Sequence, residues 1–416
     1  MTAKDFEFYI NHKDSDIDDL ILHASRYPEI DMRAVAVQLK GRSIALRKLP
    51  SWASVDDVLY PEHISMEQCS SEQTGRYKGE MARRLYDSLL KSEKDGSGKS
   101  SLKGVGLADL TGGFGVDAVM MYGNFDRCRL TFVERNPDLC RLATHNFPLL
   151  GVDCADVRCG ECESLLPDLD HQDIIFIDPA RRDVHGRKTV ALSDCLPDIT
   201  LIQDQLVSKG DIVIVKLSPM LDMRKAMADL KCLREMHVVS VEGECKELLA
   251  VLSSVIPEHG VDGVDIYCVN IMKGVTCSEH YTLDEIAGAV CEYTSVVGRY
   301  LYEPNASIMK ANAQNALAAV RGIAKLHPNS HLLTSDTKVE DFPGRRFEVI
   351  EVLDFSKKGQ KALVSNFKKA NITVRNFPLS VAQLRKRLKI SEGGNDYLFA
   401  TTLADNSLVI IVCKPF

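Results

Sequence analysis

A glycine-rich stretch that follows a carboxylate is the part of the sequence best suited to hold a ligand. Residues 107–118 read LADLTGGFGVDA, so Asp109 stands just before Gly112, Gly113 and Gly115. Glycines let the backbone come close to a ligand, because they carry no side chain and adopt conformations closed to other residues. The stretch therefore predicts a loop that lies against a bound molecule.

The ligand of this loop is either a dinucleotide or a molecule without a phosphate. Gly113, Gly115 and Ala118 fit the G-x-G-x-x-A pattern of dinucleotide-binding sites. Glu134 follows 19 positions after Gly115, and it suits the ribose of either ligand, because a carboxylate can accept hydrogen bonds from both ribose hydroxyls. Asp109 argues against a phosphate, since its charge would repel a pyrophosphate but attract a cationic amino group or a sulfonium.

A second carboxylate ends an apolar run further along the chain. Residues 173–183 read DIIFIDPARRD, in which Asp178 and Pro179 follow four apolar residues. In a doubly wound sheet the carboxyl ends of the strands line the ligand crevice, and a proline there makes a rigid turn. The pattern therefore places Asp178 at such a crevice.

Short β-rich runs alternate with helix-like stretches between about residues 105 and 275. The runs are 129–134, 173–178, 211–217, 237–242 and 264–270. Strands that alternate with helices indicate a mostly parallel sheet covered on both faces. Residues 1 to about 90 indicate helices, and residues 94–104, rich in Gly, Ser and Lys, indicate an exposed loop or linker.

The chain after residue 276 has a different pattern. Residues 281–301 and 304–327 predict helices; Pro304 can start the second, and Asn305 or Ser307 can cap it. Beyond residue 328, strand-like and helix-like runs mix, which predicts an α+β unit. Two of these runs, 365–371 and 384–390, predict basic amphipathic helices.

Composition and charge indicate a soluble protein with one basic part. The chain has 416 residues, 45% of them hydrophobic and 26% charged, and no apolar run approaches the length of about twenty residues that a membrane span needs. Its first residues lack a secretory apolar core, and its thirteen cysteines then indicate reduced thiols, so we expect a cytoplasmic protein with no membrane partner.

Residues 321–390 carry fifteen Lys and Arg against six Asp and Glu, whereas the whole chain has a net charge of −7. This part either meets a polyanion or is an ordinary solvated surface.

Four of these features together resemble the class I S-adenosylmethionine-dependent methyltransferases. They are the loop Asp109-x-Thr111-Gly112-Gly113-x-Gly115, the strand-end Glu134, the pair Gly160-Glu161 and the run Asp178-Pro179-Ala180-Arg181, which cover about residues 105–275. The resemblance implies S-adenosylmethionine as cofactor. Asp109, Thr111 and the glycines would then approach its methionine part. Glu134 would hold its ribose, and Glu161 or Cys162 would border its adenine.

Nearly the whole chain looks like a narrower family, the bacterial methyltransferases with a C-terminal THUMP-like domain. The resemblance is carried by EQCSSEQTGRYK (67–78), DPARRD (178–183), VKLSPMLD (215–222), ECKELL (244–249), EPNASIMKA (303–311), LLTSD (332–336), DFPGRRF (341–347), VRNFPL (374–379) and GGNDYLFATTL (393–403). It implies an α/β fold, with a Rossmann-like doubly wound methyltransferase sheet, an N-terminal helical region and a C-terminal α+β THUMP-like module. The expected limits are 1–100 for the helical region, 101–275 for the methyltransferase core, 276–328 for a helical or ferredoxin-like connector and 329–416 for the THUMP-like domain. Because the family is named after RNA-binding modules, it also implies RNA as substrate.

The run that begins at Asp178 indicates the methyl acceptor. Many amino methyltransferases have Asp or Asn, two prolines and an aromatic residue at this place, and here Asp178 and Pro179 match whereas Ala180 and Arg181 do not. We expect Asp178, Pro179 and Arg181 to form the catalytic group. Arg181 or Arg182 would bind a backbone phosphate or stack on a base, unless Arg181 pairs structurally with a carboxylate. No cysteine is placed to attack a pyrimidine carbon, so a base nitrogen is the expected acceptor.

Basic side chains of the C-terminal part are the expected contacts to tRNA or rRNA. Together with Arg182 they are Lys368, Lys369, Arg385, Lys386 and Arg387. Such side chains neutralise phosphates without reading sequence, although an ordinary surface helix would have the same pattern. Three other functions stay open: a protein or small-molecule methyltransferase, a catalytically silent RNA-binding protein, and an NAD-dependent oxidoreductase, against which Asp109 and Asp178 argue.

Cysteines near the expected adenine site suggest a metal only by their spacing. Cys154, Cys159 and Cys162 form C-x4-C-x2-C, which suits a metal site. Cys159 and Cys162 also flank the pair that is expected beside the cofactor. We therefore expect free thiols and no metal.

Three polar stretches have both a functional and a structural interpretation. Residues 70–80 form either a lid over the cofactor, as the family resemblance implies, or a solvated helix start, with Ser70 and Gln73 at the spacing of a capping box. The charges of 244–249 either contact substrate or form a salt bridge in a loop. Lys216, at the end of an expected strand, either faces the acceptor or is structural.

Overall fold

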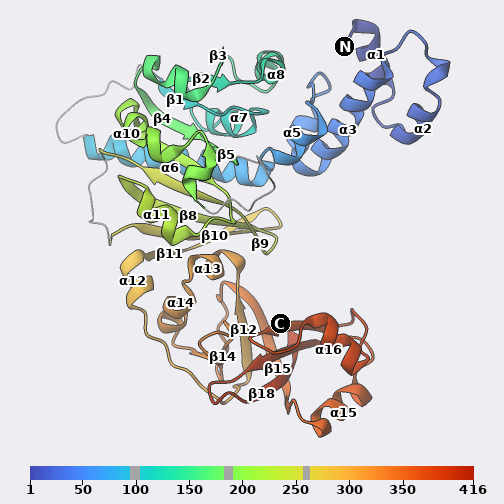
Figure 1. Cartoon of the computed structure of the whole chain (residues 1–416), viewed down its shortest axis with the longest axis vertical. Coiled ribbons are helices and arrows are strands. Elements are labelled where there is room, and N and C mark those ends of the chain that lie inside the picture. The colour runs from blue at the N-terminus through green and yellow to red at the C-terminus, as the bar shows by residue number, and fades with distance from the viewer. Residues whose placement is uncertain (94–103, 182–190, 256–262) are drawn as a thin grey trace. The chain divides into compact units, whose positions relative to one another are not determined.

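The structure, a computed structural model, describes residues 1–93, 104–181, 191–255 and 263–416 (Figure 1). They form two compact units, Met1–Met236 with Glu247–Glu258, and His237–Lys246 with His259–Phe416. The predicted linker 94–104 lies outside the described residues except for Gly104, and Arg182 also lies outside them. In the described part of the chain, no helix has the length and apolarity needed to cross a membrane.

The sheet of the first unit is built mostly from parallel strands. In sheet order it reads β9 (Glu244–Leu252), β7 (Gly210–Leu217), β4 (Gln172–Ile177), β1 (Val105–Asp109), β2 (Cys128–Glu134) and β3 (Ala155–Cys159). The last five are parallel to one another, and β9 is antiparallel to β7. β1, β4 and β7 are almost wholly buried, as expected for a parallel sheet covered on both faces. The predictions of strands at 129–134, 173–178 and 211–217 are confirmed.

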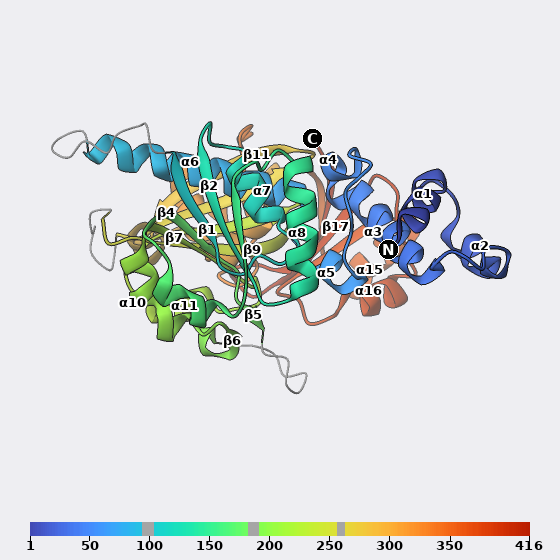
Figure 2. The same ribbon diagram turned by 90° about the horizontal axis from the view of Figure 1, so that it is seen from above.

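Helices cover both faces of this sheet, so the predicted doubly wound arrangement is confirmed. α6 (Glu72–Glu93) and α7 (Val116–Tyr122) lie on one face, and α10 (Ile199–Lys209) and α11 (Met223–Asp229) lie on the other (Figure 2). α8 (Pro137–Leu149) packs against β2 and β3. α9 (Cys162–Leu165) follows β3, and β5 (Ala180–Arg181) pairs with β6 (Cys195–Leu196). Short 3-10 helices occur at Ala24–Arg26, Leu166–Asp168 and Leu192–Asp194.

The N-terminal helices are part of the first unit and pack on its glycine loop. They are α1 (Ala3–Asn11), α2 (Ile17–Leu22), α3 (Met32–Lys48), α4 (Pro50–Ala53) and α5 (His63–Gln68). Trp52 is 1% exposed, and its ring centroid lies 4.9 Å from that of Phe114 in the loop. The backbone of Leu59 exchanges two hydrogen bonds with the side chain of Asn146 in α8. The loop is therefore backed by helices that come from another part of the sequence.

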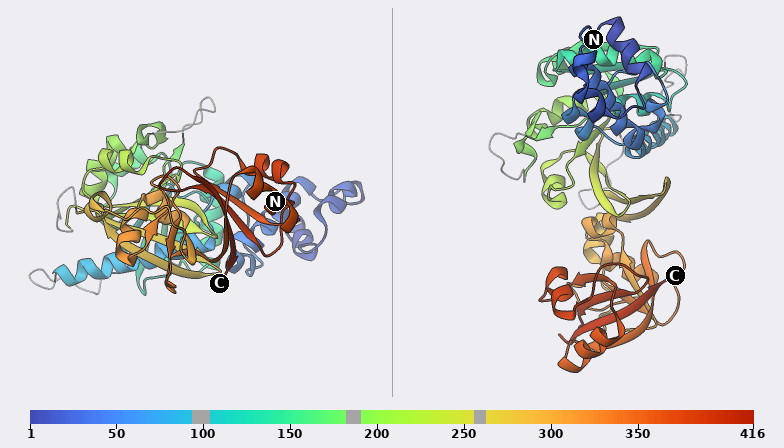
Figure 3. Two further views of the ribbon diagram at one scale, coloured as in Figure 1. Left: turned by 90° about the horizontal axis from the view of Figure 1, so that it is seen from below. Right: turned by 90° about the vertical axis from the view of Figure 1, so that its right-hand side faces the viewer.

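The second unit contains two β-structures. β8 (Leu233–Val241), which belongs to this unit from His237 on, lies beside β10 (Asp265–Met272), and β10 forms an antiparallel hairpin with β11 (Val275–Thr282). The other structure is a seven-stranded sheet in the order β13 (Ala324–Lys325), β14 (Leu333–Ser335), β12 (Tyr300–Pro304), β15 (Gly344–Asp354), β18 (Leu408–Pro415), β17 (Tyr397–Thr402) and β16 (Asn371–Arg375). α15 (Lys357–Asn366) and α16 (Val381–Leu388) lie side by side on this sheet (Figure 3). The strands predicted at 237–242 and 264–270 and the predicted α+β unit are confirmed.

The two long helices predicted after residue 276 are mostly wrong. Only α12 (Leu283–Gly288) forms within 281–301, because the residues that follow, rich in β-branched side chains, favour helix weakly. The stretch 304–327 divides into α13 (Ala306–Ala311) and α14 (Gln314–Arg321), since Asn312 takes a left-handed conformation with φ of +58° and ends α13. The predicted cap is confirmed, because the side chain of Asn305 accepts a hydrogen bond from the amide of Ile308.

The basic helix predicted at 365–371 is also wrong, whereas the one at 384–390 is confirmed as the last part of α16. α15 ends at Asn366, since Phe367 has extended backbone angles. Lys368 and Lys369 therefore lie between α15 and β16.

Candidate active site

The glycine loop after β1 has no room for side chains at two of its three glycines. A Cβ atom at Gly112 would lie 2.1 Å from Cζ of Phe132, and one at Gly115 would lie 2.8 Å from Cε1 of Phe147. Gly113 and Gly115 have φ angles of +56° and +87°, which glycine adopts without strain. A Cβ atom at Gly113 would meet no atom closer than 3.8 Å. The loop is therefore packed tightly on its inner side and open at Gly113.

Glu134, at the end of β2, holds the glycine loop from the side. Its Oε2 accepts a hydrogen bond from the amide of Gly113 at 2.7 Å, and its Oε1 accepts one from the amide of Asn136 at 2.7 Å. Its carbonyl oxygen accepts a third, from the amide of Gly160 at 3.0 Å. The side chain is half-buried, and each carboxylate oxygen can accept further hydrogen bonds. Glu134 thus joins the ends of β1, β2 and β3 and keeps acceptor capacity for a ligand.

Residues after β3 form the far side of this edge. Glu161 is exposed and precedes the first residue of α9, whereas Cys162 is 5% exposed. Burial raises the pKa of Cys162 to about 12, so its thiol stays protonated. All thirteen cysteines are free thiols. Among the described residues, no three His, Cys, Asp or Glu side chains are grouped so that they could hold a metal ion.

Asp109 ends β1 and is almost completely buried. It is 1% exposed, and its Oδ1 accepts a hydrogen bond from the amide of Thr111 at 3.1 Å. Burial raises the pKa of this carboxyl well above its ordinary value, and the carboxylates of Asp117 and Asp178 add to the shift. Asp109 therefore shapes the start of the loop, while its environment opposes a negative charge there.

Asp178 follows β4 and is tied to the glycine loop through its backbone. Its amide donates a hydrogen bond to Oγ1 of Thr111 at 2.6 Å. Its side chain is 36% exposed, and Pro179 beside it is buried. Arg181 lies in β5, but its side chain, like Arg182 as a whole, is outside the described part. The structure thus brings Asp178 to the same edge as Thr111, as the sequence predicts.

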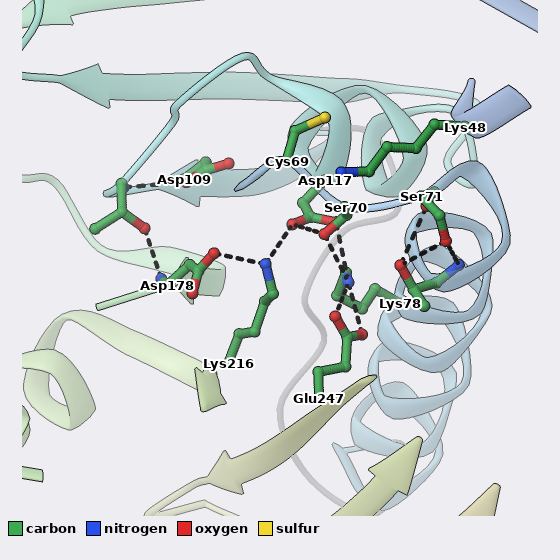
Figure 4. Close-up of polar contacts among 12 residues, drawn as sticks. Lys48, Cys69, Ser70, Ser71, Lys78, Asp109, Asp117, Asp178, Lys216 and Glu247 are labelled. Carbon is green, nitrogen blue, oxygen red and sulfur yellow. Dashed lines mark hydrogen bonds and ion pairs between the residues drawn. The ribbon is translucent and has the colours of Figure 1, made fainter. Parts of the chain in front are cut away.

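A chain of ion pairs leads inward from Asp178 (Figure 4). Lys216, near the end of β7, donates a hydrogen bond from Nζ to Oδ2 of Asp178 at 2.6 Å, and the same Nζ lies 3.8 Å from Oδ2 of Asp117. Burial opposes the charge of Lys216, but the neighbouring carboxylates, Asp178 first, outweigh burial and raise its pKa above the ordinary value. Lys216 therefore stays an ammonium between two carboxylates.

The chain of ion pairs continues through a fully buried lysine. Lys78 of α6 is 0% exposed, and its Nζ donates to both carboxylate oxygens of Glu247 at 2.7 and 2.9 Å. It also donates to Oγ of Ser70 at 3.1 Å and lies 3.1 Å from Oδ1 of Asp117. Ser70 in turn donates to Oδ2 of Asp117 at 2.8 Å. We call Asp178, Lys216, Asp117, Lys78 and Glu247 the charge chain.

Sequence reasoning did not identify the charge chain, although it singled out three of its members. Lys216 stays at the strand end where it was expected. Glu247, expected in a loop, lies in β9 instead and is 3% exposed. Lys78 lies within the polar stretch 70–80, and Asp117 lies within the glycine stretch. The one local signal was a lysine within a helix that also has an apolar face; the two carboxylates that pair with Lys78, Asp117 of α7 and Glu247 of β9, lie far from it in the sequence.

The start of α6 differs in one respect from the prediction. The cap is Ser71, whose Oγ accepts a hydrogen bond from the amide of Thr74 at 3.2 Å, and the predicted capping box of Ser70 and Gln73 is wrong. Ser70 is 7% exposed and turns its hydroxyl to Asp117 instead, because that buried carboxylate needs a donor. Lys48 of α3 donates to the carbonyl oxygens of residues 66 and 67 and so supports the turn that leads to Ser70. A lid over the cofactor stays a prediction.

The basic residues of the second unit lie on α16 and before β16. Arg385 donates to the carbonyl oxygen of Ala370 at 3.2 Å, and Arg387 donates to Oε1 of Gln360 at 2.8 Å. These two arginines therefore also stabilise the fold of the second unit through hydrogen bonds within it. Lys368, Lys369 and Lys386 are exposed. Their contact with RNA stays a prediction.

The residues at the edge of the sheet fit S-adenosylmethionine better than a dinucleotide. The open side of Gly113 and the remaining acceptor capacity of Glu134 suit a nucleoside. Asp178 and Asp117 add carboxylates beside the loop, which would repel a pyrophosphate and attract a sulfonium.

Two family models match the C-terminal part of the chain. A model described as THUMP domain-like matches residues 344–415, and a model described as a ferredoxin-like domain matches residues 300–343. No curated protein matches the chain.

Among solved structures, one from Porphyromonas gingivalis W83, described as a putative methyltransferase, is similar over nearly its whole length. It is 31% identical, the match covers 99% of this chain and 97% of that one, and the TM-score is 0.84. Cofactor-bound Rv0187 from MTB is 14% identical, with 57% and 97% of the two chains covered and a TM-score of 0.32. A SAM-dependent methyltransferase from Agrobacterium tumefaciens is 14% identical, with 47% and 58% covered and a TM-score of 0.27. On the similarity to the first structure, the THUMP-like match and the arrangement of the sheet, the chain belongs to the family of bacterial class I S-adenosylmethionine-dependent methyltransferases with a C-terminal THUMP-like domain.

Proposed function

We propose that this protein transfers a methyl group from S-adenosylmethionine to a base nitrogen in structured RNA, either tRNA or rRNA. The observation that carries the proposal is the edge of the first unit's sheet, where the glycine loop, Glu134 and Asp178 meet. The THUMP-like match in the same chain supports RNA as the acceptor. Of the four domains proposed from the sequence, with limits at 100, 275 and 328, residues 101–275 would transfer the methyl group and residues 329–416 would bind the RNA.

The residues that would hold the cofactor are those of the loop and of the next two strand ends. Asp109, Thr111, Gly112, Gly113 and Gly115 would face its methionine part. Glu134 would accept hydrogen bonds from its ribose, and Glu161 or Cys162 would border its adenine. When bound, the cofactor supplies an electrophilic methyl group on a sulfonium.

Asp178 is the proposed contact to the acceptor nitrogen. Its Oδ2 accepts the hydrogen bond from Lys216, which leaves Oδ1 for an N–H group of the base. A carboxylate in this place orients the amine and accepts its hydrogen bond while the nitrogen becomes positive. Pro179 fixes the turn, and Arg181 or Arg182 would bind the nucleotide in place of an aromatic ring.

Removing Asp178 should abolish methyl transfer. The test is transfer of a labelled methyl group from S-adenosylmethionine to total RNA from cells that lack the protein, with the wild type, Asp178→Ala and Asp204→Ala. Asp204 is an exposed partner of Lys231, so Asp204→Ala is a matched control and should keep full activity. We expect a loss of at least about 100-fold for Asp178→Ala, as for removal of a positioning and acid–base group. Absence of label in RNA with the wild type would contradict RNA as acceptor and favour a protein or small-molecule acceptor or a silent binding protein.

Reversing charge on the basic surface of the second unit should weaken RNA binding. Lys368→Glu combined with Lys386→Glu should lower tRNA or rRNA affinity by roughly tenfold and reduce the slope of log affinity against log salt by roughly 1–2, because fewer counterions are released. Binding is measured by filter retention at several salt concentrations. Lys4→Glu combined with Lys231→Glu changes the charge equally on exposed lysines of the first unit and should have a smaller effect. Equal effects of the two double variants would place the RNA contact elsewhere.

A further inference from the structure

The charge chain has a surplus of negative charge next to the proposed cofactor site. It contains three carboxylates (Asp178, Asp117 and Glu247) and two ammonium groups (Lys216 and Lys78), so its formal charge is one negative. Four of its five side chains are at most 14% exposed, and solvent screens charges weakly at such burial. The surplus therefore acts on whatever charge is bound nearby.

Two members of the charge chain are joined to the glycine loop itself. Asp117 lies in the first turn of α7, directly after the loop that ends at Gly115. Asp178 is joined to the loop from the other side, through the 2.6 Å hydrogen bond of its amide to Thr111. Oδ1 of Asp117 lies 3.1 Å from Nζ of Lys78 and its Oδ2 lies 3.8 Å from Nζ of Lys216, so Asp117 shares both ammonium groups with the other two carboxylates of the charge chain.

Asp109, the carboxylate that the sequence suggested for attracting a cation, is poorly suited to supply this charge. It is 1% exposed, it already accepts the amide of Thr111, and its burial raises its pKa. By contrast, ammonium groups hold Asp117 in its charged form: although burial opposes that form, Lys78 and Lys216 lower the pKa of Asp117. The charge chain thus adds to the negative charge that Glu134 brings to this edge.

We propose that the charge chain makes the site prefer the sulfonium cofactor over its neutral thioether product. The inference rests on the proposed function, in which S-adenosylmethionine binds at the glycine loop. Loss of the methyl group removes one positive charge from the ligand, so S-adenosylhomocysteine loses the attraction and leaves more readily. A unit charge changes the affinity of a cation by about tenfold at roughly 12 Å and an effective dielectric constant of about 20.

The test measures the affinities of S-adenosylmethionine and S-adenosylhomocysteine by titration calorimetry, without any turnover. Asp178→Asn removes one negative charge and should lower the preference for the sulfonium by about threefold to thirtyfold. Lys216→Met removes one positive charge and should raise the preference by a similar factor. Lys231→Met, which breaks an exposed 2.7 Å pair with Asp204, is the control and should leave the preference unchanged.

The opposite directions of the two variants separate charge from damage to the fold. A distorted site would weaken both ligands together and leave their ratio unchanged. Glu247→Gln removes a negative charge at the end of the charge chain opposite Asp178. This second variant should also lower the preference for the sulfonium, as Asp178→Asn does. An unchanged ratio in Asp178→Asn and Lys216→Met, with both ligands still bound, would overturn the inference alone. Failure of the wild type to bind either ligand would overturn the proposed cofactor and the inference with it.

Discussion

Gly112→Ala should remove cofactor binding and destabilise the first unit. The new Cβ atom would lie 2.1 to 2.6 Å from three ring carbons of Phe132, and Phe132 is fully buried in β2. The ring has no space to withdraw, so the loop must shift. Overpacking of this kind costs about 1–3 kcal/mol of the free energy of unfolding. Affinity for S-adenosylmethionine should fall by about 100-fold or more, because a misplacement of 1 Å can cost that much.

Thermal unfolding with and without S-adenosylmethionine measures both effects of Gly112→Ala. The cofactor should raise the unfolding temperature of the wild type but not that of the variant, because a ligand that binds only the folded state stabilises it. Gly123→Ala is the matched control. Its Cβ atom would meet nothing closer than 3.5 Å, and its φ of −62° suits alanine. Gly112→Ala that binds the cofactor as tightly as Gly123→Ala would contradict the position of the site.

Lys78→Met should be the most destabilising single change in the charge chain. Lys78 is 0% exposed and neutralises Glu247, which is itself 3% exposed. Removing one partner of a buried pair leaves the other charge uncompensated, at a cost of about 3–5 kcal/mol. Burial already raises the pKa of Glu247, so the variant should respond by protonating this carboxyl. Denaturant unfolding at neutral pH measures the loss.

Two further variants show whether the loss comes from the unpaired charge. Lys78→Met combined with Glu247→Leu should recover part of the stability, since apolar replacement of both partners of a buried pair is often tolerated. Lys231→Met should cost no more than about 1 kcal/mol, because its pair with Asp204 is exposed. A loss of under about 1 kcal/mol for Lys78→Met would show that Lys78 is not held as the structure indicates.

The sequence was sufficient for the parts of the site that local patterns specify. The apolar run before Asp178 predicts a strand that ends there, and the glycines after Asp109 predict the loop that follows another strand. Because parallel strands end at one edge of the sheet, the positions of Glu134 and Asp178 follow from these runs. The charge chain could not be predicted, because its pairs join residues such as Lys78 and Glu247 that are 169 positions apart. A polar stretch at the start of a helix also usually indicates a solvent-exposed surface and not a buried ion pair.

The errors in the second half of the chain have local causes. Asn312 divides a stretch that has helical composition on both sides, because its left-handed φ of +58° ends α13. The end of α15 at Asn366 places Lys368 and Lys369 outside any helix, although their neighbours have a helical pattern. Both cases show that helix existence is easier to predict than helix ends.

The central claim is that the edge containing Gly113, Glu134 and Asp178 binds S-adenosylmethionine. Titration calorimetry of the wild-type protein with S-adenosylmethionine and, in parallel, with NAD tests it most directly. The account predicts that the chain binds S-adenosylmethionine at one site, that Gly112→Ala loses this binding, and that NAD does not bind. Binding of NAD in place of S-adenosylmethionine, or S-adenosylmethionine binding that Gly112→Ala leaves unchanged, would contradict it.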